Sequence, residues 1–281
     1  MRHAKLLGFE HHEIESVAAI AEGPAAIALS RGGARKTYSY TDPNEDAVGF
    51  AIGPAGVVAA VADGHHGARG AECAIEWVLT HLAEPWTATH APCADETGWS
   101  QAAGDALQRV HRAVIEQGES MGIAPAPTTL SLALVRPDQD RIVHASVGDS
   151  HAFRVAREDD ALSARDLGWA TTGERSCPFL GYSYDGGVLR DSQWVVGCEA
   201  ITGATALVLA SDGLSERYIG VEDPAAAVTA AVAHGTDHDP QLRALETCRQ
   251  VTELALAAHR ENRSGDNMSA AVVWLEDLGF G

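Results

Sequence analysis

Acidic residues recur in this sequence where a short apolar run ends or begins. The residues in these places are Glu45, Asp46, Asp63, Asp149, Asp212 and Asp266. Asp63, for example, follows the run VVAAVA at 57–62 and is itself followed by a glycine and two histidines. A carboxylate at the end of a buried segment is partly removed from water, and several such groups brought together repel one another unless a cation lies among them. The pattern therefore predicts a cation site built from the ends of several strands.

The chemistry of these side chains favours a hard divalent cation. Carboxylates, together with a backbone carbonyl and water, suit Mg²⁺ or Mn²⁺, whereas zinc would be expected to have histidine or cysteine ligands. Glycine follows the acid in Asp63-Gly64 and in Asp212-Gly213, so the chain can turn sharply and the Gly64 carbonyl can approach a metal. Taken singly, an Asp-Gly pair after a strand is more often a turn than a ligand. Only the whole set carries the prediction.

Short strands and amphipathic helices are the elements that would position these acids. Apolar runs of strand length, bounded by Gly, Pro, Asp or Asn, occur at 25–30, 47–52, 57–62, 129–135, 142–147, 206–210 and 270–275. The turns GPAG and RPDQDR join two pairs of these runs into hairpins, which predicts antiparallel sheet. Helical spacing of apolar residues predicts helices over 70–82, 101–117, 225–233 and 242–259. Strands in two groups with helices between them favour an α+β fold of packed layers over alternating βαβ units.

The length and composition are those of a folded globular protein. The chain has 281 residues, of which 46% are hydrophobic, and no Pro/Ser linker or internal repeat divides it. We therefore expect a single domain over residues 1–281 with its core at about 25–275. A polar, glycine-rich stretch at about 166–194 is expected to form a flap, a long surface excursion of the kind that often has a function.

Charge and cysteine usage exclude several classes of partner. The formal net charge of −19 argues against nucleic acid and against membrane surfaces. The five cysteines are scattered and include no C-x-x-C pair, so neither a disulfide framework nor a zinc knuckle is indicated. The first residues lack the apolar core of a secretion signal, and no later run is long enough to span a membrane. We therefore expect a cytoplasmic protein.

Six motifs, five of which contain these acids, occur in a fixed order. They are NEDA (44–47), ADGHHG (62–67), TTLSLALV (128–135), VGDSHA (147–152), LASDGLSE (209–216) and SGDNMSAAVV (264–273). As a set, they resemble the metal-dependent type 2C protein serine/threonine phosphatases in their compact bacterial form, from about residue 25 to residue 275. The resemblance implies a four-layer α/β/β/α sandwich of two antiparallel sheets flanked by helices, which agrees with the layers expected above.

The resemblance also implies a ligand set for two Mg²⁺ or Mn²⁺ ions and a third, weaker metal. The implied ligands are Glu45, Asp46, Asp63, the carbonyl of Gly64, Asp149, Asp212, Glu216 and Asp266. Asp63 would bridge the two principal ions, and Asp149 and Glu216 match the positions of the third. Glu45 and Asp46 match the family's acidic pair, which acts directly or through metal-bound water.

The activity implied by the resemblance is hydrolysis of phosphoserine and phosphothreonine in proteins by a water activated between two metals. The departing alkoxide must be protonated, and His65, two residues after Asp63, matches the family's general acid. His66 has no such role. The partners would be phosphorylated proteins, either substrates of a serine/threonine kinase or the kinase itself, and the chain is expected to act as a monomer in bacterial signalling.

The sequence departs from the family at the phosphate-binding position. The family has an arginine four residues before the Glu of the acidic pair, where this chain has Thr41. A longer loop could return Arg35 to the site, so Arg35 is the expected phosphate-binding residue, the alternative being that the metals alone bind phosphate. Pro127 and His151 also replace a usual glycine and arginine, and we interpret both as structural variation.

Two other functions stay open on the sequence alone. One is a catalytically weak phosphatase fold retained for sensing or scaffolding, which would fit the missing arginine but not the complete set of acids. The other is a phosphatase of small phosphorylated metabolites, which would use the same metal chemistry. Assays of the purified protein with Mn²⁺ against phosphopeptides and metabolites would distinguish them.

Overall fold

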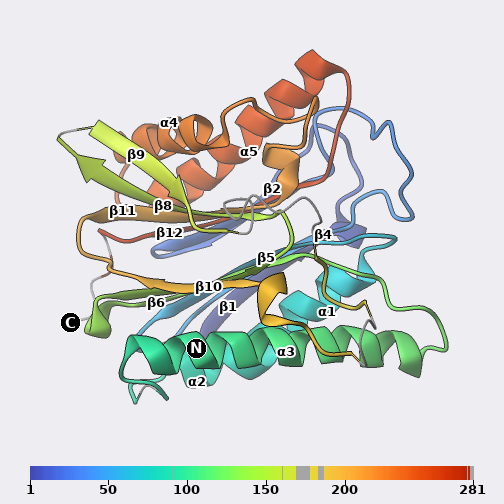
Figure 1. Cartoon of the computed structure of the whole chain (residues 1–281). Coiled ribbons are helices and arrows are strands. Elements are labelled where there is room, and N and C mark those ends of the chain that lie inside the picture. Colours follow the sequence, from blue (N-terminus) through green and yellow to red (C-terminus); the bar gives the residue numbers. More distant parts are fainter. Residues whose placement is uncertain (91, 160, 169–177, 183–186, 277, 279–281) are drawn as a thin grey trace.

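The computed structural model of the chain has four layers, two antiparallel sheets packed face to face with helices on the outer side of each (Figure 1). It describes residues 1–281 apart from 91, 160, 169–177, 183–186, 277 and 279–281. The arrangement confirms the predicted α/β/β/α sandwich.

The first sheet is built on the two predicted hairpins. Its order is β1-β4-β5-β6-β7-β10, and each neighbouring pair is antiparallel. Its strands are β1 (Arg2–Leu7), β4 (Asp46–Ile52), β5 (Val57–Asp63), β6 (Leu130–Arg136), β7 (Arg141–Val147) and β10 (Val195–Glu199). The four middle strands match predicted runs to within one residue at each end, whereas β1 and β10 were not predicted.

The second sheet has the order β2-β3-β12-β11-β8-β9 and is also antiparallel throughout. Its strands are β2 (Ala18–Glu22), β3 (Ala25–Ser30), β8 (His151–Glu158), β9 (Ala161–Asp166), β11 (Ala204–Ala210) and β12 (Met268–Trp274). Strands β3, β11 and β12 correspond to predicted runs, and β2, β8 and β9 do not.

Helices cover the outer face of each sheet (Figure 1). The first sheet is covered by α1 (Arg69–Trp77), α2 (Ala83–Thr87) and α3 (Glu96–Ser120), and the second by α4 (Pro224–Thr236) and α5 (Arg243–Asn262). Short 3-10 turns lie at η1 (Gly8–Glu10), η3 (Pro137–Gln139), η6 (Asp191–Gln193) and η7 (Asp212–Leu214). In the part of the chain that the structure describes, no helix is both long and apolar enough to cross a membrane.

The helix predicted over 70–82 changes type before its end. After α1 the chain continues as a π-helical turn, η2 (Val78–Leu82), and then as α2. Pro85 lies in α2 and has no N–H to donate to the carbonyl four residues earlier, so an unbroken α-helical ladder is impossible there. The wider turn accommodates the proline without ending the helical segment.

Buried side chains fill three spaces, one between the sheets and one between each sheet and its helices. Phe50 lies between the sheets, Trp99 beneath the helices of the first sheet and Trp274 beneath those of the second. The central strands are buried on both faces, so their sequences are continuously apolar rather than alternating. These strands are rigid supports for whatever their ends carry.

The stretch predicted as a surface flap, 166–194, packs in part against the core where it can be described. Residues 169–177 and 183–186 of this flap lie outside the described residues. Leu180 is fully buried and exchanges two backbone hydrogen bonds with Thr128, of 2.8 and 3.1 Å. Leu189 is buried as well. The structure therefore differs from the predicted surface excursion at these points, because apolar residues within the stretch fasten it to the core.

Candidate active site

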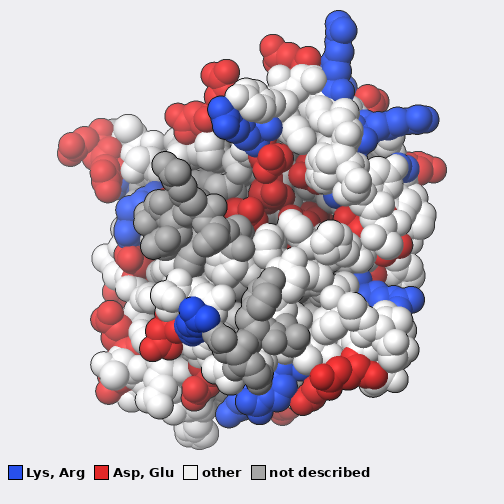
Figure 2. All heavy atoms as spheres, turned by 45° about the vertical axis from the view of Figure 1, so that its right-hand side comes forward, with Lys and Arg blue, Asp and Glu red and all other residues white. Residues whose placement is uncertain are grey.

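Acidic side chains from both sheets converge on a hollow in the molecular surface (Figure 2). We call this hollow the acidic pocket. The residues that line it are Lys36, Tyr38, Ser39, Glu45, Asp63, Gly64, His65, His66, Asp149, Asp212, Glu216 and Asp266. Every acid predicted for the site lines the pocket except Asp46, which lies beneath it.

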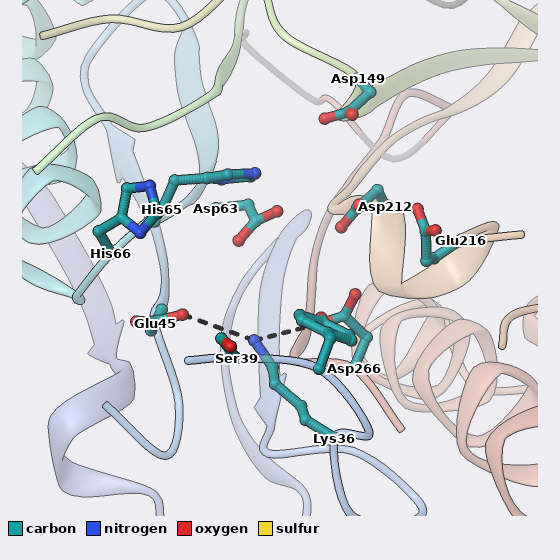
Figure 3. A pocket seen from close by; sticks show the side chains of 12 residues that line it. Lys36, Ser39, Glu45, Asp63, His65, His66, Asp149, Asp212, Glu216 and Asp266 are labelled. Carbon is teal, nitrogen blue, oxygen red and sulfur yellow. Dashed lines mark ion pairs between the residues drawn. The ribbon is translucent and has the colours of Figure 1, made fainter. Parts of the chain in front are cut away.

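Three of these carboxylates come closest together. Asp63 ends β5, Asp149 lies in the turn between β7 and β8, and Asp212 begins η7 directly after β11. Each offers a carboxylate oxygen, and these oxygens all lie within 4.8 Å of one another. In Figure 3, Asp149 lies above Asp212 and Glu216 lies beside it. The first sheet and the second sheet thus each contribute acids to one site.

The clustered carboxylates raise the pKa of Asp63 and Asp212. Burial raises the pKa of Asp63 well above its usual value, and repulsion from Asp212 and Asp46 raises it further. The pKa of Asp212 is raised by burial and then by Asp266 and Asp149. The Oδ1 atoms of Asp149 and Asp212 are buried without a hydrogen-bond partner. A bound cation would relieve both the repulsion and the unpaired oxygens, and the all-oxygen donor set fits Mg²⁺ or Mn²⁺.

The acidic pair at the start of β4, Glu45 and Asp46, is buried at the pocket. Asp46 is fully buried, stands opposite Asp63 in the β4–β5 register, and accepts a 2.7 Å hydrogen bond from the Ser269 hydroxyl. Its Oδ1 has no partner, and burial raises the pKa of Asp46 to about 6. Oε1 of Glu45 accepts hydrogen bonds from two backbone N–H groups of the preceding loop, at 3.0 and 3.2 Å. Glu45 is therefore fixed by the backbone, while Asp46 keeps one oxygen free.

Lys36 brings a positive charge into the pocket. Its Nζ lies 3.2 Å from Oδ1 of Asp266 and 3.7 Å from Oε2 of Glu45 (Figure 3). Burial alone would lower the pKa of this ammonium group, but the surrounding carboxylates, Asp266 foremost, outweigh burial and raise the pKa. Arg35, the predicted phosphate-binding residue, is exposed and is not among the residues that line the pocket. The loop thus brings Lys36 to the pocket, whereas the sequence prediction had placed Arg35 there.

Close backbone packing requires the glycine of both Asp-Gly pairs. A Cβ on Gly64 would lie 2.6 Å from the carbonyl oxygen of Glu45, and one on Gly213 would lie 1.9 Å from the carbonyl oxygen of Asn267. The Gly64 N–H also donates to the Glu45 carbonyl at 3.1 Å. Neither glycine has a positive φ, so the need is for close approach rather than for an unusual turn. These contacts fasten the loops that carry the acids to one another.

His65 lies at the margin of the pocket. Its backbone N–H donates to the Pro127 carbonyl at 2.7 Å, and its ring packs on Phe179 with centroids 4.2 Å apart. Nδ1 of His65 is buried without a hydrogen-bond partner, and burial lowers the pKa of the imidazole. His66 also lines the pocket but is exposed, at a φ of 65°. Of the two histidines, His65 is the one whose orientation is fixed by packing, in part by the flap residue Phe179.

A third histidine, for which the sequence indicated no function, connects the pocket to the flap. His151 begins β8, and its Nδ1 lies 2.6 Å from Oδ2 of Asp166 while its Nε2 lies 2.5 Å from Oγ of Ser215. Asp166 ends β9 where the flap begins, and Ser215 lies in the loop that carries Asp212. The partners are 15 and 64 residues away along the chain, so no local motif could have indicated them.

Comparison with known proteins gives both a family and a fold. The profile of the family described as "Protein phosphatase 2C" matches residues 35–255. Serine-threonine phosphatase 2C from Toxoplasma gondii is 17% identical over 93% of this chain and 99% of its own, with a TM-score of 0.66. Stp1 from Staphylococcus aureus is 17% identical over 90% of this chain and 95% of its own, with a TM-score of 0.60. The catalytic domain of PstP in complex with two manganese ions is 20% identical over 92% of this chain and 98% of its own, with a TM-score of 0.58. A search of curated protein sequences finds no match.

Proposed function

This chain belongs to the protein phosphatase 2C family, and we propose that it is a metal-dependent phosphatase that hydrolyses phosphoserine and phosphothreonine in proteins. The observation that carries the proposal is the convergence of Asp63, Asp149 and Asp212, whose carboxylate oxygens lie within 4.8 Å of one another in a surface pocket. A phosphorylated side chain that projects from a protein surface could enter such a hollow.

The proposed metal ligands are the acids that the pocket gathers. Two Mg²⁺ or Mn²⁺ ions would be held by Asp63, the Gly64 carbonyl, Asp212 and Asp266, with Glu45 and Asp46 acting directly or through water and Asp149 and Glu216 at a third, weaker site. Bound ions would lower the pKa of a water molecule, orient the phosphate and neutralise the charge on its oxygens. The two manganese ions in the PstP structure support the proposed metal and number, since that protein shares the fold.

The chain's own residues would do the rest of the chemistry. His65 would donate the proton that the departing serine or threonine alkoxide needs, because its ring is fixed at the margin of the pocket by Phe179. Lys36 would attract the phosphate oxygens through its ammonium group, which already lies among the pocket's acids. Glu45 and Asp46 would hold their positions through the backbone of the Thr41 loop and through Ser269.

We further propose phosphorylated proteins as partners, including a serine/threonine kinase or its substrates, and a monomer that works in the cytoplasm. The four cysteines within the described residues are free thiols, which supports a reducing compartment. The net charge of −19 supports the exclusion of nucleic acid and anionic membranes.

Removal of single carboxylates tests this function. With Mn²⁺ present, Asp63→Asn or Asp212→Asn should each lower the turnover of p-nitrophenyl phosphate on the order of 10³-fold, because several kcal/mol of metal-dependent stabilisation is lost. Asp105→Asn changes the same charge on the exposed face of α3 and should leave turnover unchanged. Undiminished turnover in either pocket variant would contradict the two-metal proposal.

The choice of substrate separates the proposed function from its alternatives. The wild-type protein with Mn²⁺ should hydrolyse phosphoserine and phosphothreonine peptides faster than a panel of phosphorylated metabolites. Faster hydrolysis of a metabolite would favour a small-molecule phosphatase. Metal binding without turnover of any substrate would favour a sensing or scaffolding module.

A further inference from the structure

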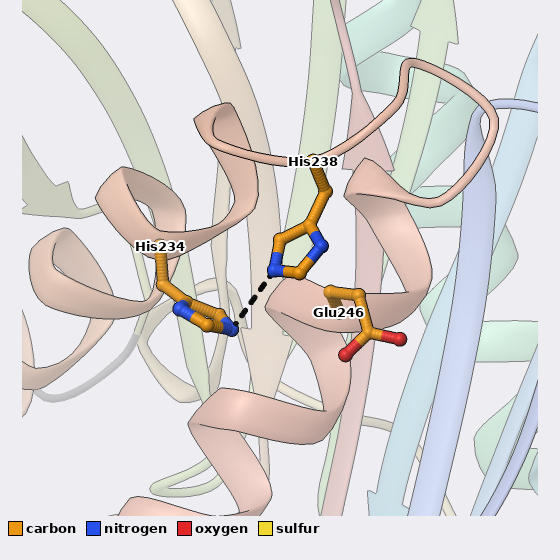
Figure 4. A group of neighbouring side chains, drawn as sticks. All are labelled: His234, His238 and Glu246. Carbon is orange, nitrogen blue, oxygen red and sulfur yellow. Dashed lines mark hydrogen bonds between the residues drawn. The ribbon is translucent and has the colours of Figure 1, made fainter.

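Two histidines and a glutamate meet on the helical layer of the second sheet, outside the acidic pocket (Figure 4). His234 lies in the last turn of α4, His238 follows the helix in the connection to α5, and Glu246 lies in the first turn of α5. One ligand atom of each residue lies within 4.8 Å of the others. His234 is exposed and the other two are half-buried, so a solute can reach the group from the surface.

The spacing of the two imidazoles matches that of ligands on one metal. Nε2 of His234 and Nε2 of His238 lie 3.2 Å apart, and the rings are inclined at 67°. Two nitrogens bound to a tetrahedral Zn²⁺ at about 2.0 Å would lie about 3.3 Å apart. Without a metal, this contact needs one ring to donate its Nε2 proton to the other. With a metal, both Nε2 atoms would be ligands and both Nδ1 atoms would carry the protons.

The donor set selects a different class of metal from the one expected in the acidic pocket. Two imidazoles and one carboxylate suit zinc and its neighbours in the transition series, whereas Mg²⁺ prefers oxygen ligands alone. The guanidinium of Arg249, which is largely exposed, lies 3.8 Å from Oε1 of Glu246, so the ion pair between them is weak.

We propose that His234, His238 and Glu246 form a second metal site that binds Zn²⁺ with three protein ligands and water in the fourth position. Because its ligands come from α4, the connection and α5, bound zinc would cross-link the two helices that cover the second sheet. The site is separate from the acidic pocket. Glu246 lies 13 residues before His259, whose Nε2 contacts the Gly213 carbonyl at 2.7 Å beside Asp212, and that stretch of α5 is about 20 Å long.

Zinc titration of the purified protein tests the site by binding and by thermal stability, with no need for phosphatase activity. Mg²⁺ is kept in excess to occupy the acidic pocket, and the same titration is repeated on Asp63→Asn. At about a hundredfold excess of free zinc over Kd, the wild-type protein should melt about 5 °C higher. The double variant His234→Ala/His238→Ala should lose one bound zinc per chain and this shift in melting temperature. Glu246→Gln, which keeps its size, should weaken zinc binding at least about tenfold.

Two matched variants control for changes in surface charge and in histidine content. Arg249→Gln removes the ion pair of Glu246 but no ligand, and His90→Ala removes an exposed histidine beside the other sheet. Both should bind zinc as the wild type does. Co²⁺ in place of Zn²⁺ should give the visible absorption of a tetrahedral nitrogen–oxygen site, and the double variant should lack it. Equal zinc binding by the wild type and the double variant, or loss of binding in Asp63→Asn alone, would overturn the proposal.

Discussion

Lys36 places an ammonium group in the pocket proposed to receive the phosphate, 3.2 Å from Asp266 and 3.7 Å from Glu45. A charge-assisted hydrogen bond from this group to a phosphate oxygen is worth about 1.5–3 kcal/mol. Lys36→Ala should therefore raise the KM for a phosphopeptide about tenfold or more and change kcat less. Steady-state kinetics at saturating Mn²⁺ would measure both constants.

Arg35 provides the matched control for Lys36, since it is the neighbouring cation and is exposed. Arg35→Ala should leave KM unchanged, and Lys36→Arg should recover most of the lost affinity because it keeps the charge. A rise in KM for Arg35→Ala, with none for Lys36→Ala, would restore the original sequence prediction.

The proposed acid, His65, gives a second prediction at the scale of a residue. A serine or threonine alkoxide needs a proton as it leaves, whereas p-nitrophenolate is stable without one. His65→Ala should therefore slow phosphopeptide hydrolysis about 10²-fold and p-nitrophenyl phosphate hydrolysis much less. The exposed neighbour His66→Ala should affect neither substrate strongly. Equal slowing of both substrates by His65→Ala would exclude an acid role.

Among single residues, the acids of the pocket could be predicted from the sequence. Lys36 and His151, which interact with those acids or with the loops that carry them, could not. Asp63 and Asp212 each follow an apolar run, and a strand's end is fixed by the strand, so their convergence follows from the fold. Lys36 lies in an irregular loop. The sequence of such a loop has no hydrophobic periodicity from which its course could be predicted. His151 bonds to residues on β9 and on the Asp212 loop, which are neighbours only after the second sheet has formed.

Among the elements, β8 is linked by the His151 side chain to two other segments. His151 contacts Asp166 at the end of β9 and Ser215 in the loop after β11. His151→Phe should keep the stacking on Phe153, whose centroid lies 5.2 Å away, but lose the bonds to Asp166 and Ser215. The Asp212 loop would then be less ordered, so the Mn²⁺ concentration for half-maximal activity should rise about tenfold. If His151 had a purely structural role, His151→Phe would lower the melting temperature but leave the Mn²⁺ concentration for half-maximal activity unchanged. His151→Arg, the residue usual in the family, should restore metal affinity if a bond to Asp166 is what matters.

Strands could be predicted from the sequence where complete burial makes their residues continuously apolar. β4 and β5 are buried along their whole length and were found almost to the residue. β9 lies at a sheet edge, and its residues are alternately exposed and half-buried. Its sequence is therefore partly polar and was not recognised as a strand. α3 begins at Glu96, five residues before its predicted start, because Asp95 caps it by accepting the Gly98 N–H at 2.8 Å.

For the whole molecule, part of the excess of acidic residues lies in the acidic pocket. The chain has 39 acidic against 20 basic residues, and Figure 2 shows carboxylates inside the hollow itself. Buried groups with raised pKa values destabilise the metal-free fold while they are ionised. If the proposed metals bind in the acidic pocket, we expect the stability of the whole molecule to depend on them.

Removing one carboxylate should consequently stabilise the metal-free protein and abolish its response to metal. In EDTA at about pH 8, Asp212→Asn should melt about 2 °C above the wild type, roughly 1 kcal/mol, because the repulsion at Asp63 and Asp266 falls. Added Mn²⁺ should raise the melting temperature of the wild type far more than that of the variant.

The sign of the pH dependence follows from the raised pKa of Asp212. The folded state takes up the proton at a higher pH than the unfolded state, so the destabilisation is complete above the folded pKa, decreases as the pH falls below it and is absent below the unfolded pKa. The advantage of Asp212→Asn should thus shrink as the pH is lowered from about 8. Asp105→Asn, on the exposed face of α3, removes the same formal charge and should shift neither the metal-free melting temperature nor its pH dependence. Calorimetry of the three proteins with EDTA and with Mn²⁺ measures each quantity, and a metal-free wild type as stable as Asp212→Asn at pH 8 would contradict the argument.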